Sequence, residues 1–142
     1  EKNLVVVITR GNTGEICVYC STQVSRLIAN YKKVKEQNGQ VVVIYPVAGQ
    51  SDSASLTEFL QSAKEKLEDP STKLPFPALL DVNLNVVKQL DIERDLSAPA
   101  TYIVDTSGNV KFAYVGETAA DRPSVNEIIR QLKEINKTGA TN

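Results

Sequence analysis

The stretch Cys17-Val18-Tyr19-Cys20 holds both cysteines of this 142-residue chain and lies where a strand-forming run gives way to a helix-forming one. On the first turn of a helix, residues three apart lie on the same side, so two sulfurs at this spacing can close a disulfide with little backbone movement. The free N–H groups and the positive dipole end of the helix also stabilise a thiolate at Cys17. The spacing therefore predicts reversible dithiol chemistry at Cys17 and Cys20.

The composition excludes several other kinds of site. The chain contains no histidine, which rules out Ser-His-Asp and Cys-His catalysis and imidazole metal ligands. Two cysteines are too few for a structural zinc site or an iron–sulfur cluster, each of which needs about four ligands. We therefore expect neither a metal nor a cofactor.

Charge and hydropathy limit the partners. The 16 basic and 17 acidic residues are scattered along the chain, which argues against a nucleic-acid or anionic-membrane partner. The longest apolar run, Leu4 to Ile8, is far shorter than the roughly 20 residues that span a bilayer. Because the chain lacks methionine even at position 1, we expect that a signal, an anchor or an extra strand has been removed before Glu1. This favours an exported or membrane-tethered domain of the cell envelope.

Two apolar runs predict parallel strands at the centre of a sheet. Leu4 to Ile8 is β-branched without polar alternation, the pattern of a strand covered on both faces, and Val41 to Tyr45 repeats it. Between them, apolar residues at helical spacing from Val24 to Val34 predict one helix, which Asn38-Gly39 ends. A shorter strand at Phe76 to Leu80 and a short helix follow.

The last third of the chain predicts a hairpin and a closing helix. Thr101 to Asp105 and Val110 to Val115 flank a tight turn, which is typical of two antiparallel strands. Ser124 and Glu127 have the spacing of a capping box at a helix start. The order of elements predicts an α/β fold with a mixed central sheet and helices on both faces, in a single domain over residues 1–142.

Two separated motifs resemble the thioredoxin superfamily: the Cys-x-x-Cys after a first strand, and Ala98-Pro99-Ala100-Thr101 leading a later strand. The run over residues 98–110 is similar to the Pro-x-Thr-Phe-hydrophobic-hydrophobic-Asp-x-x-Gly stretch of one branch. That branch contains alkyl hydroperoxide reductase, thiol-specific antioxidant and membrane-tethered thiol reductases. The resemblance covers nearly the whole chain and implies a thioredoxin-like fold of the redoxin type.

The same resemblance implies a substrate-contacting surface beside the dithiol. Members of the superfamily place a cis proline there, so we expect a cis Ala98–Pro99 bond. We also expect Ala98, Pro99, Val18 and Tyr19 to contact the substrate. A trans proline that merely begins a strand is the structural alternative.

The first functional hypothesis is a thiol-disulfide oxidoreductase. In it, Cys17 attacks a protein or small-molecule disulfide and Cys20 then resolves the mixed disulfide. A thiol donor such as thioredoxin or a membrane reductase would restore the dithiol. Arg10 lowers the thiol pKa if the loop after the first strand folds back, whereas Glu15 raises it if it lies close.

The second hypothesis is a peroxiredoxin-like thiol peroxidase with an antioxidant role, in which Cys20 is the peroxidatic cysteine. Cys20-Ser21-Thr22-Gln23 resembles the peroxiredoxin run that begins at that cysteine. Against it, the Pro and Thr of the Pro-x-x-x-Thr-x-x-Cys motif are replaced by Thr13 and Cys17. The guanidinium partner of the thiolate falls at Pro99, so this alignment predicts that the charge is missing. A redox-inactive binding module is a third hypothesis.

Overall fold

The computed structural model describes residues 1–11, 17–48 and 53–140, with side chains described as far as residue 138. Its elements in chain order are β1 (Asn3–Ile8), α1 (Val18–Ala29), α2 (Tyr31–Glu36), β2 (Gly39–Val47), α3 (Ser53–Glu65), β3 (Ala78–Val82), α4 (Asn85–Gln89), β4 (Glu93–Arg94), β5 (Leu96–Ser97), β6 (Ala100–Val104), β7 (Val110–Val115) and α5 (Val125–Ala140).

One five-stranded mixed sheet organises the structure, in the order β3-β2-β1-β6-β7. β1, β2 and β3 run parallel, with Val5 opposite Val41 in the first pair, whereas β6 is antiparallel to both β1 and β7. The predicted parallel pair and the predicted hairpin are therefore confirmed. β4 and β5 form a separate two-stranded ribbon.

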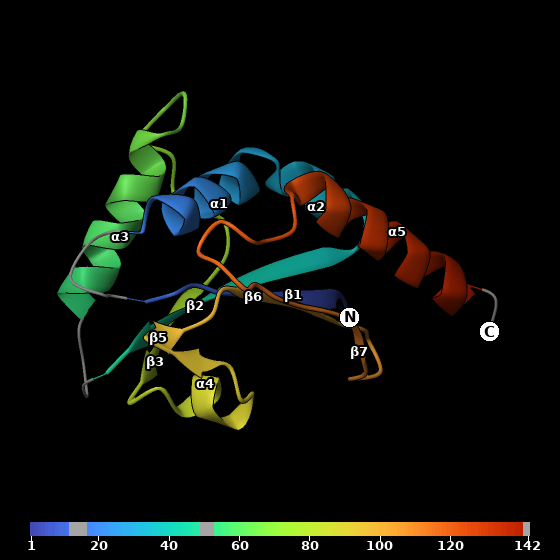
Figure 1. Ribbon diagram of the computed structural model, residues 1–142. Helices are drawn as coiled ribbons and strands as arrows, with labels where there is room; N and C mark the ends of the chain where they lie inside the picture. The colour runs from blue at the N-terminus through green and yellow to red at the C-terminus, as the bar shows by residue number, and fades with distance from the viewer. Residues whose placement is uncertain (12–16, 49–52, 141–142) are drawn as a thin grey trace.

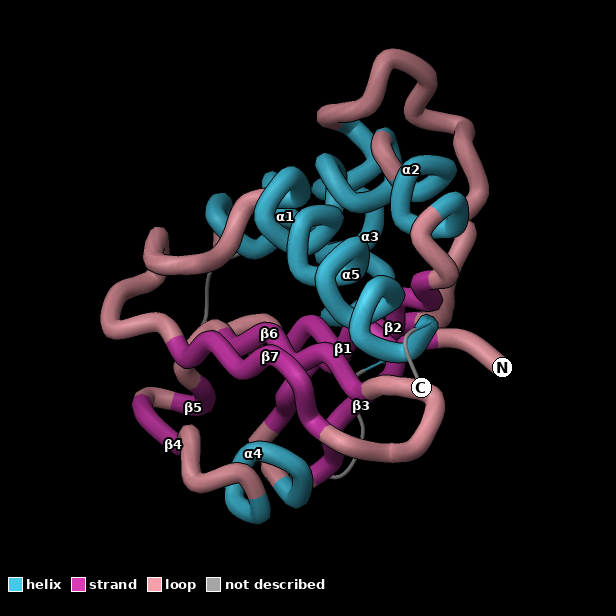
Figure 2. Tube along the Cα trace, turned by 90° about the vertical axis from the view of Figure 1, so that its right-hand side faces the viewer, coloured by secondary structure: helices cyan, strands magenta, loops and turns pink. Residues whose placement is uncertain are grey.

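Helices cover both faces of this sheet, as predicted, but unequally. Figures 1 and 2 show α1, α2, α3 and α5 on one side and the short α4 on the other. Successive residues of β1 point to opposite faces of the sheet. Val5 and Val7 are fully buried under the larger helical layer, whereas Ile8 packs on the other face with Val87 of α4. β1 is thus covered on both faces, as its continuous apolar run predicts.

The single helix predicted between the first two strands is broken into α1 and α2 at Asn30. The Asn30 backbone N–H and Nδ2 both donate to the Arg26 carbonyl, at 3.0 and 2.8 Å, which ends α1. At the end of α2 it is Asn38, with φ of 58°, that adopts the left-handed conformation. Gly39 instead begins β2, at a position where a side chain would meet Val34 Cγ1 at 2.7 Å.

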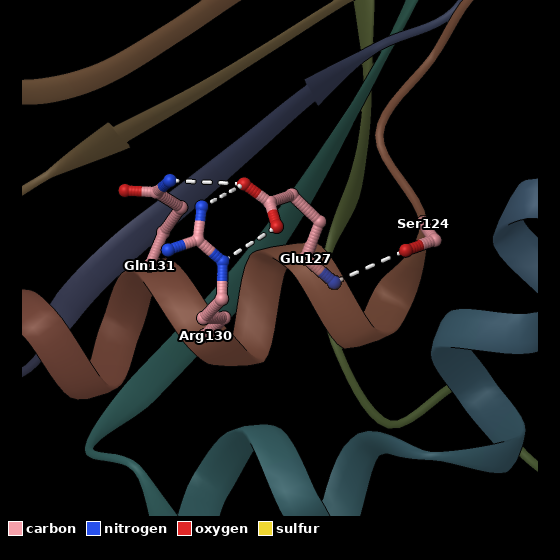
Figure 3. A network of polar contacts seen from close by, with 4 residues as sticks. All are labelled: Ser124, Glu127, Arg130 and Gln131. Carbon is pink, nitrogen blue, oxygen red and sulfur yellow. Dashed lines mark hydrogen bonds and ion pairs between the residues drawn. The ribbon is translucent and has the colours of Figure 1, made fainter.

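Half of the predicted capping box forms at the start of α5. The Glu127 backbone N–H donates to Ser124 Oγ at 3.1 Å (Figure 3). The Glu127 carboxylate does not turn back to complete the box. It accepts instead from Arg130, at 2.8 and 2.6 Å, and from Gln131 at 3.0 Å. Within the residues described, no helix is both long enough and apolar enough to cross a membrane.

Gly116, directly after β7, is held in a space without room for a side chain. A Cβ there would lie 2.1 Å from the Asp121 carbonyl oxygen and 2.9 Å from Pro99 Cγ. We expect Gly116→Ala to lower the free energy of unfolding by about 3 kcal/mol, since backbone must move to admit the methyl group. Gly108→Ala is the control, because Gly108 has φ of +86° but open space around it, and only about 1 kcal/mol of conformational cost is expected. Equal losses in urea titrations would contradict this account.

Candidate active site at the first turn of helix α1

Cys17 occupies the N-cap of α1, in extended backbone conformation with φ of −70° and ψ of 111°. Its Sγ accepts a hydrogen bond from the Cys20 backbone N–H at 3.3 Å. The sulfur thus caps one of the N–H groups that a helix start leaves without an internal partner. The Cys17 side chain is half-buried and packs at the margin of the core. This arrangement matches the predicted position of the first sulfur.

Cys20 faces inward one turn later and has no exposed surface. Its Sγ lies 3.4 Å from the Arg10 backbone N–H and 3.3 Å from Arg122 Nη2, and both groups donate to it. Both cysteines are free thiols. The more deeply buried sulfur therefore receives the guanidinium contact.

Arg122 is the functional residue that sequence reasoning missed. Its Nη1 donates to Gln23 Oε1 at 2.8 Å, and its Nε and Nη2 donate to the Ala119 carbonyl at 3.0 and 2.8 Å. The expectation that no guanidinium reaches the cysteine is wrong, because it considered only the sequence position of Pro99. The charge comes from the connection between β7 and α5, which passes the start of α1 in Figure 1.

The directions of the strands could have indicated where Arg122 lies. β1 and β7 are each antiparallel to β6, so their carboxyl ends lie at the same edge of the sheet. Arg10 follows β1 and Arg122 follows β7, which brings both segments to the start of α1. Strand directions alone would have predicted that these two connections meet.

The paired thiols share one proton unequally. The pKa of Cys17 is lowered to about 5, chiefly because the Cys20 side chain donates to its sulfur, with further help from the Cys20 backbone N–H and the charges of Arg122 and Arg10. The pKa of Cys20 is raised, first by that same interaction and then by burial, although the Arg122 charge opposes both. At neutral pH the thiolate therefore lies on Cys17 and the proton on Cys20.

The Ala98–Pro99 peptide bond is trans, so the expected cis bond is wrong. The Ala98 N–H donates to the Ile92 carbonyl at 2.9 Å, and the Pro99 carbonyl accepts from the Gly116 N–H at 2.8 Å. These bonds fix an extended chain on both sides of the peptide bond. A trans proline fits directly before β6, because proline has no N–H to lose from a strand ladder.

The four residues predicted to contact the substrate differ in their exposure to solvent. Val18 and Tyr19 are 62% and 52% exposed between the two cysteines, whereas Ala98 and Pro99 are buried. A substrate-contacting role for these four residues stays a prediction. Glu15, like Thr13 of the peroxidase alignment, lies outside the described residues. The described residues contain no cluster of three or more Cys, Asp or Glu side chains that would suit a metal ion.

The sequence model of the AhpC/TSA family matches residues 2–113. This chain belongs to the AhpC/TSA family. Membership makes it a thiol-based oxidoreductase, and it confirms the redoxin branch that the motifs at residues 17–20 and 98–110 indicated. The match ends before Arg122, so the guanidinium contact is an observation independent of it. No curated protein matches the chain.

Solved peroxiredoxin structures share the fold of this AhpC/TSA chain. The mitochondrial 2-Cys peroxiredoxin of Plasmodium falciparum is 17% identical with a TM-score of 0.76, over 99% of this chain and 79% of that one. A mutant of peroxiredoxin 6 from Arenicola marina is 15% identical with a TM-score of 0.82, over 97% and 63%. A yeast mitochondrial 1-Cys peroxiredoxin is 14% identical with a TM-score of 0.78, over 98% and 66%. At these identities the likeness establishes a thioredoxin-like fold of the peroxiredoxin type.

The hydrogen bond from the Cys20 thiol to Cys17 can be tested by titration. Cys20→Ala removes the donor, so the pKa of Cys17 should rise from about 5 toward its ordinary value of 9.0. Cys20→Ser keeps a hydroxyl donor at the same position and should raise that pKa less. The ultraviolet absorbance of the thiolate against pH measures both, because Cys17 is then the only thiol. Identical midpoints for the two variants would contradict the assignment.

Proposed function

We propose that this chain is a thiol-dependent peroxidase in which Cys20 attacks the peroxide and Cys17 resolves the product. The observation that carries the proposal is the Arg122 guanidinium, 3.3 Å from Cys20 Sγ. A fixed cation at that sulfur favours its thiolate and polarises an oxygen atom bound beside it. Membership in the AhpC/TSA family and the peroxiredoxin-like fold support the same activity.

The proposed reaction begins when the Cys20 proton passes to the Cys17 thiolate. Cys20 Sγ then attacks one peroxide oxygen, so that an S–O bond forms, the O–O bond breaks and two electrons pass from sulfur to the peroxide. The leaving oxygen takes a proton from solvent and departs as water or an alcohol. Cys17 next attacks the sulfenic sulfur, and water leaves as the Cys17–Cys20 disulfide forms.

Gln23 lies three residues after Cys20, on the same face of α1, and supports this chemistry. Its side chain is 7% exposed, and its Oε1 accepts from Arg122 Nη1 at 2.8 Å. Because the oxygen must face the guanidinium, the amide Nε2 is fixed as a donor, and it has no partner among the described residues. A peroxide oxygen beside Cys20 supplies the acceptor that this buried donor lacks.

The resulting disulfide needs a thiol reductant to return two electrons. The yeast 1-Cys peroxiredoxin of similar fold is described as resolved through glutathione and thioredoxin systems. We propose a donor of the same chemical class, such as a thioredoxin-type protein or a membrane reductase. The exposed side chains of Val18 and Tyr19 lie between the two cysteines, where such a donor must dock.

A second candidate is disulfide exchange at Cys17, which the relative exposure of the two sulfurs favours. Cys17 is half-buried and its pKa is about 5, whereas Cys20 has no exposed surface. In this reaction the Cys17 thiolate attacks a substrate disulfide and expels one thiolate. Cys20 then attacks Cys17 Sγ and releases the second thiol as the Cys17–Cys20 disulfide forms. Arg122 would lower the pKa of Cys20 for that resolving step.

Single-turnover oxidation by hydrogen peroxide separates the two candidates. Cys17→Ser keeps the contact between Cys20 and Arg122 and removes the Cys17 thiolate, which is the first cause of the raised pKa of Cys20. Cys20 can then lose its proton to solvent, so this variant should still consume one equivalent of peroxide rapidly. Cys20→Ser should react about a hundredfold more slowly, because its remaining thiolate lacks the direct guanidinium contact. Peroxide loss in stopped flow measures both rates, and each variant serves as the other's control.

The reverse pattern would overturn the peroxidase proposal in favour of chemistry at Cys17. The double variant Cys17→Ser/Cys20→Ser controls for folding and should keep the thermal midpoint of the reduced protein. A Cys17–Cys20 bridge encloses too short a loop to stabilise the fold strongly.

A further inference from the structure

The connection between β7 and α5 contains a lock of hydrogen bonds that no step of the proposed reaction uses. We propose that Asp121 is a positioning residue, which holds this connection in the conformation that places the Arg122 guanidinium on Cys20 Sγ. The proposal rests on the proposed function for its catalytic consequence. Its geometry and its first test do not require peroxide.

The lock is formed by the two oxygens of one carboxylate. Asp121 Oδ1 accepts from the Tyr114 hydroxyl on β7 at 2.5 Å, and Oδ2 accepts from the Glu117 backbone N–H at 2.9 Å. One side chain therefore ties the end of the connection to both the strand and the first residues of the turn. The pKa of Asp121 is lowered by these two bonds, so the carboxylate is charged at neutral pH.

Backbone contacts restrict the conformation of the rest of the connection. The Asp121 backbone N–H donates to the Thr118 carbonyl at 3.1 Å, and the Gly116 N–H donates to the Pro99 carbonyl at 2.8 Å. The Asp121 carbonyl oxygen occupies the space that a side chain at Gly116 would need. The chain from residue 116 to 121 thus folds back on itself, and Asp121 closes the turn.

Arg122 follows the closed turn directly, so the conformation of the turn sets the position of the Arg122 Cα atom from which the side chain extends. Pro123 restricts the backbone of the preceding residue to extended conformations. The guanidinium is bound to the Ala119 carbonyl within the same turn, at 3.0 and 2.8 Å. Loss of the closed turn would therefore move both the backbone and one of the side-chain anchors of Arg122.

The direction of the Asp121 carboxylate also leaves the charge of Arg122 available to the sulfur. Asp121 is next to Arg122 in the chain, yet its oxygens face Tyr114 and Glu117. Across the described ranges, Arg122 makes no ion pair with a carboxylate. Its polar contacts are Gln23, Ala119 and Cys20 Sγ. The lock thus keeps a neighbouring negative charge away from the guanidinium.

The first test measures thiolate formation against pH in the reduced protein. Asp121→Ala removes both bonds of the lock, and Tyr114→Phe removes only the hydroxyl donor on the exposed edge strand. Arg122 lowers the pKa of Cys17 through its charge, so misplacing it should raise the first thiolate midpoint. We expect a rise of about one pH unit for Asp121→Ala and a smaller rise for Tyr114→Phe.

Glu127→Ala is the matched control. Glu127 is also a carboxylate that receives several hydrogen bonds, from Arg130 and Gln131 on α5, but it does not contact the connection that carries Arg122 (Figure 3). It should leave the thiolate midpoint unchanged. Loss of a surface carboxylate by its charge alone would lower the midpoint. An equal rise in Glu127→Ala would therefore show that the effect does not depend on the contacts of Asp121, and it would overturn the proposal.

The second test separates positioning from stability. In an Arg122→Ala background, Asp121→Ala should cause no further rise of the thiolate midpoint, because the group that it positions is gone. Independent, additive rises would overturn the proposal, as would a lower thermal midpoint with unchanged titration. Tyr114→Phe keeps the test decisive if Asp121→Ala does not fold. If the titration shifts as expected while neither the unmodified protein nor Cys17→Ser reacts rapidly with peroxide, the peroxidase proposal fails and the positioning role stands.

Discussion

The contact between the Arg122 guanidinium and Cys20 Sγ joins two residues that lie 102 positions apart. A sulfur with no exposed surface ordinarily keeps its proton, since burial disfavours the thiolate. A fixed cation beside it opposes that effect, although the hydrogen bond to Cys17 and burial still keep the pKa of Cys20 raised. The N-cap at Cys17, the amide of Gln23 and the turn before Arg122 all lie around this contact.

The sheet brings these groups together through strand direction. β1 and β7 flank the antiparallel β6 and end at the same edge, so the segments that follow them meet at the start of α1. One segment supplies the Arg10 N–H and the other supplies Arg122, while α1 supplies both sulfurs. The dithiol, its charge and its hydrogen-bond donors are thus attached to three separate segments of the chain. The larger helical layer then buries the inner sulfur against β1.

The fold was largely predictable because its strands are long apolar runs with clear turn signals. Leu4 to Ile8 and the hairpin around Gly108 specify strand type and direction locally. The break at Asn30 was not predictable from spacing, because the apolar stripe continues through it. The trans Ala98–Pro99 bond differs from expectation because that expectation came from a resemblance, whereas the bonds to Ile92 and Gly116 are particular to this packing.

The site was predictable only where it is local. The spacing of Cys17 and Cys20 places both sulfurs on one helical turn, and the structure confirms that placement. Arg122 was missed because a loop arginine carries no sequence pattern, and its role depends on strand order.

Trapping the oxidised sulfur tests the central claim most directly. The variants Cys17→Ser and Cys20→Ser each keep one sulfur, so no disulfide within the chain can consume the sulfenic acid. Each is treated with limiting hydrogen peroxide in excess dimedone, which captures sulfenic acid, and the adduct is located by peptide mass spectrometry. An adduct on Cys20 is the predicted result. An adduct confined to Cys17 would contradict the claim that the sulfur beside Arg122 is the one that reduces peroxide.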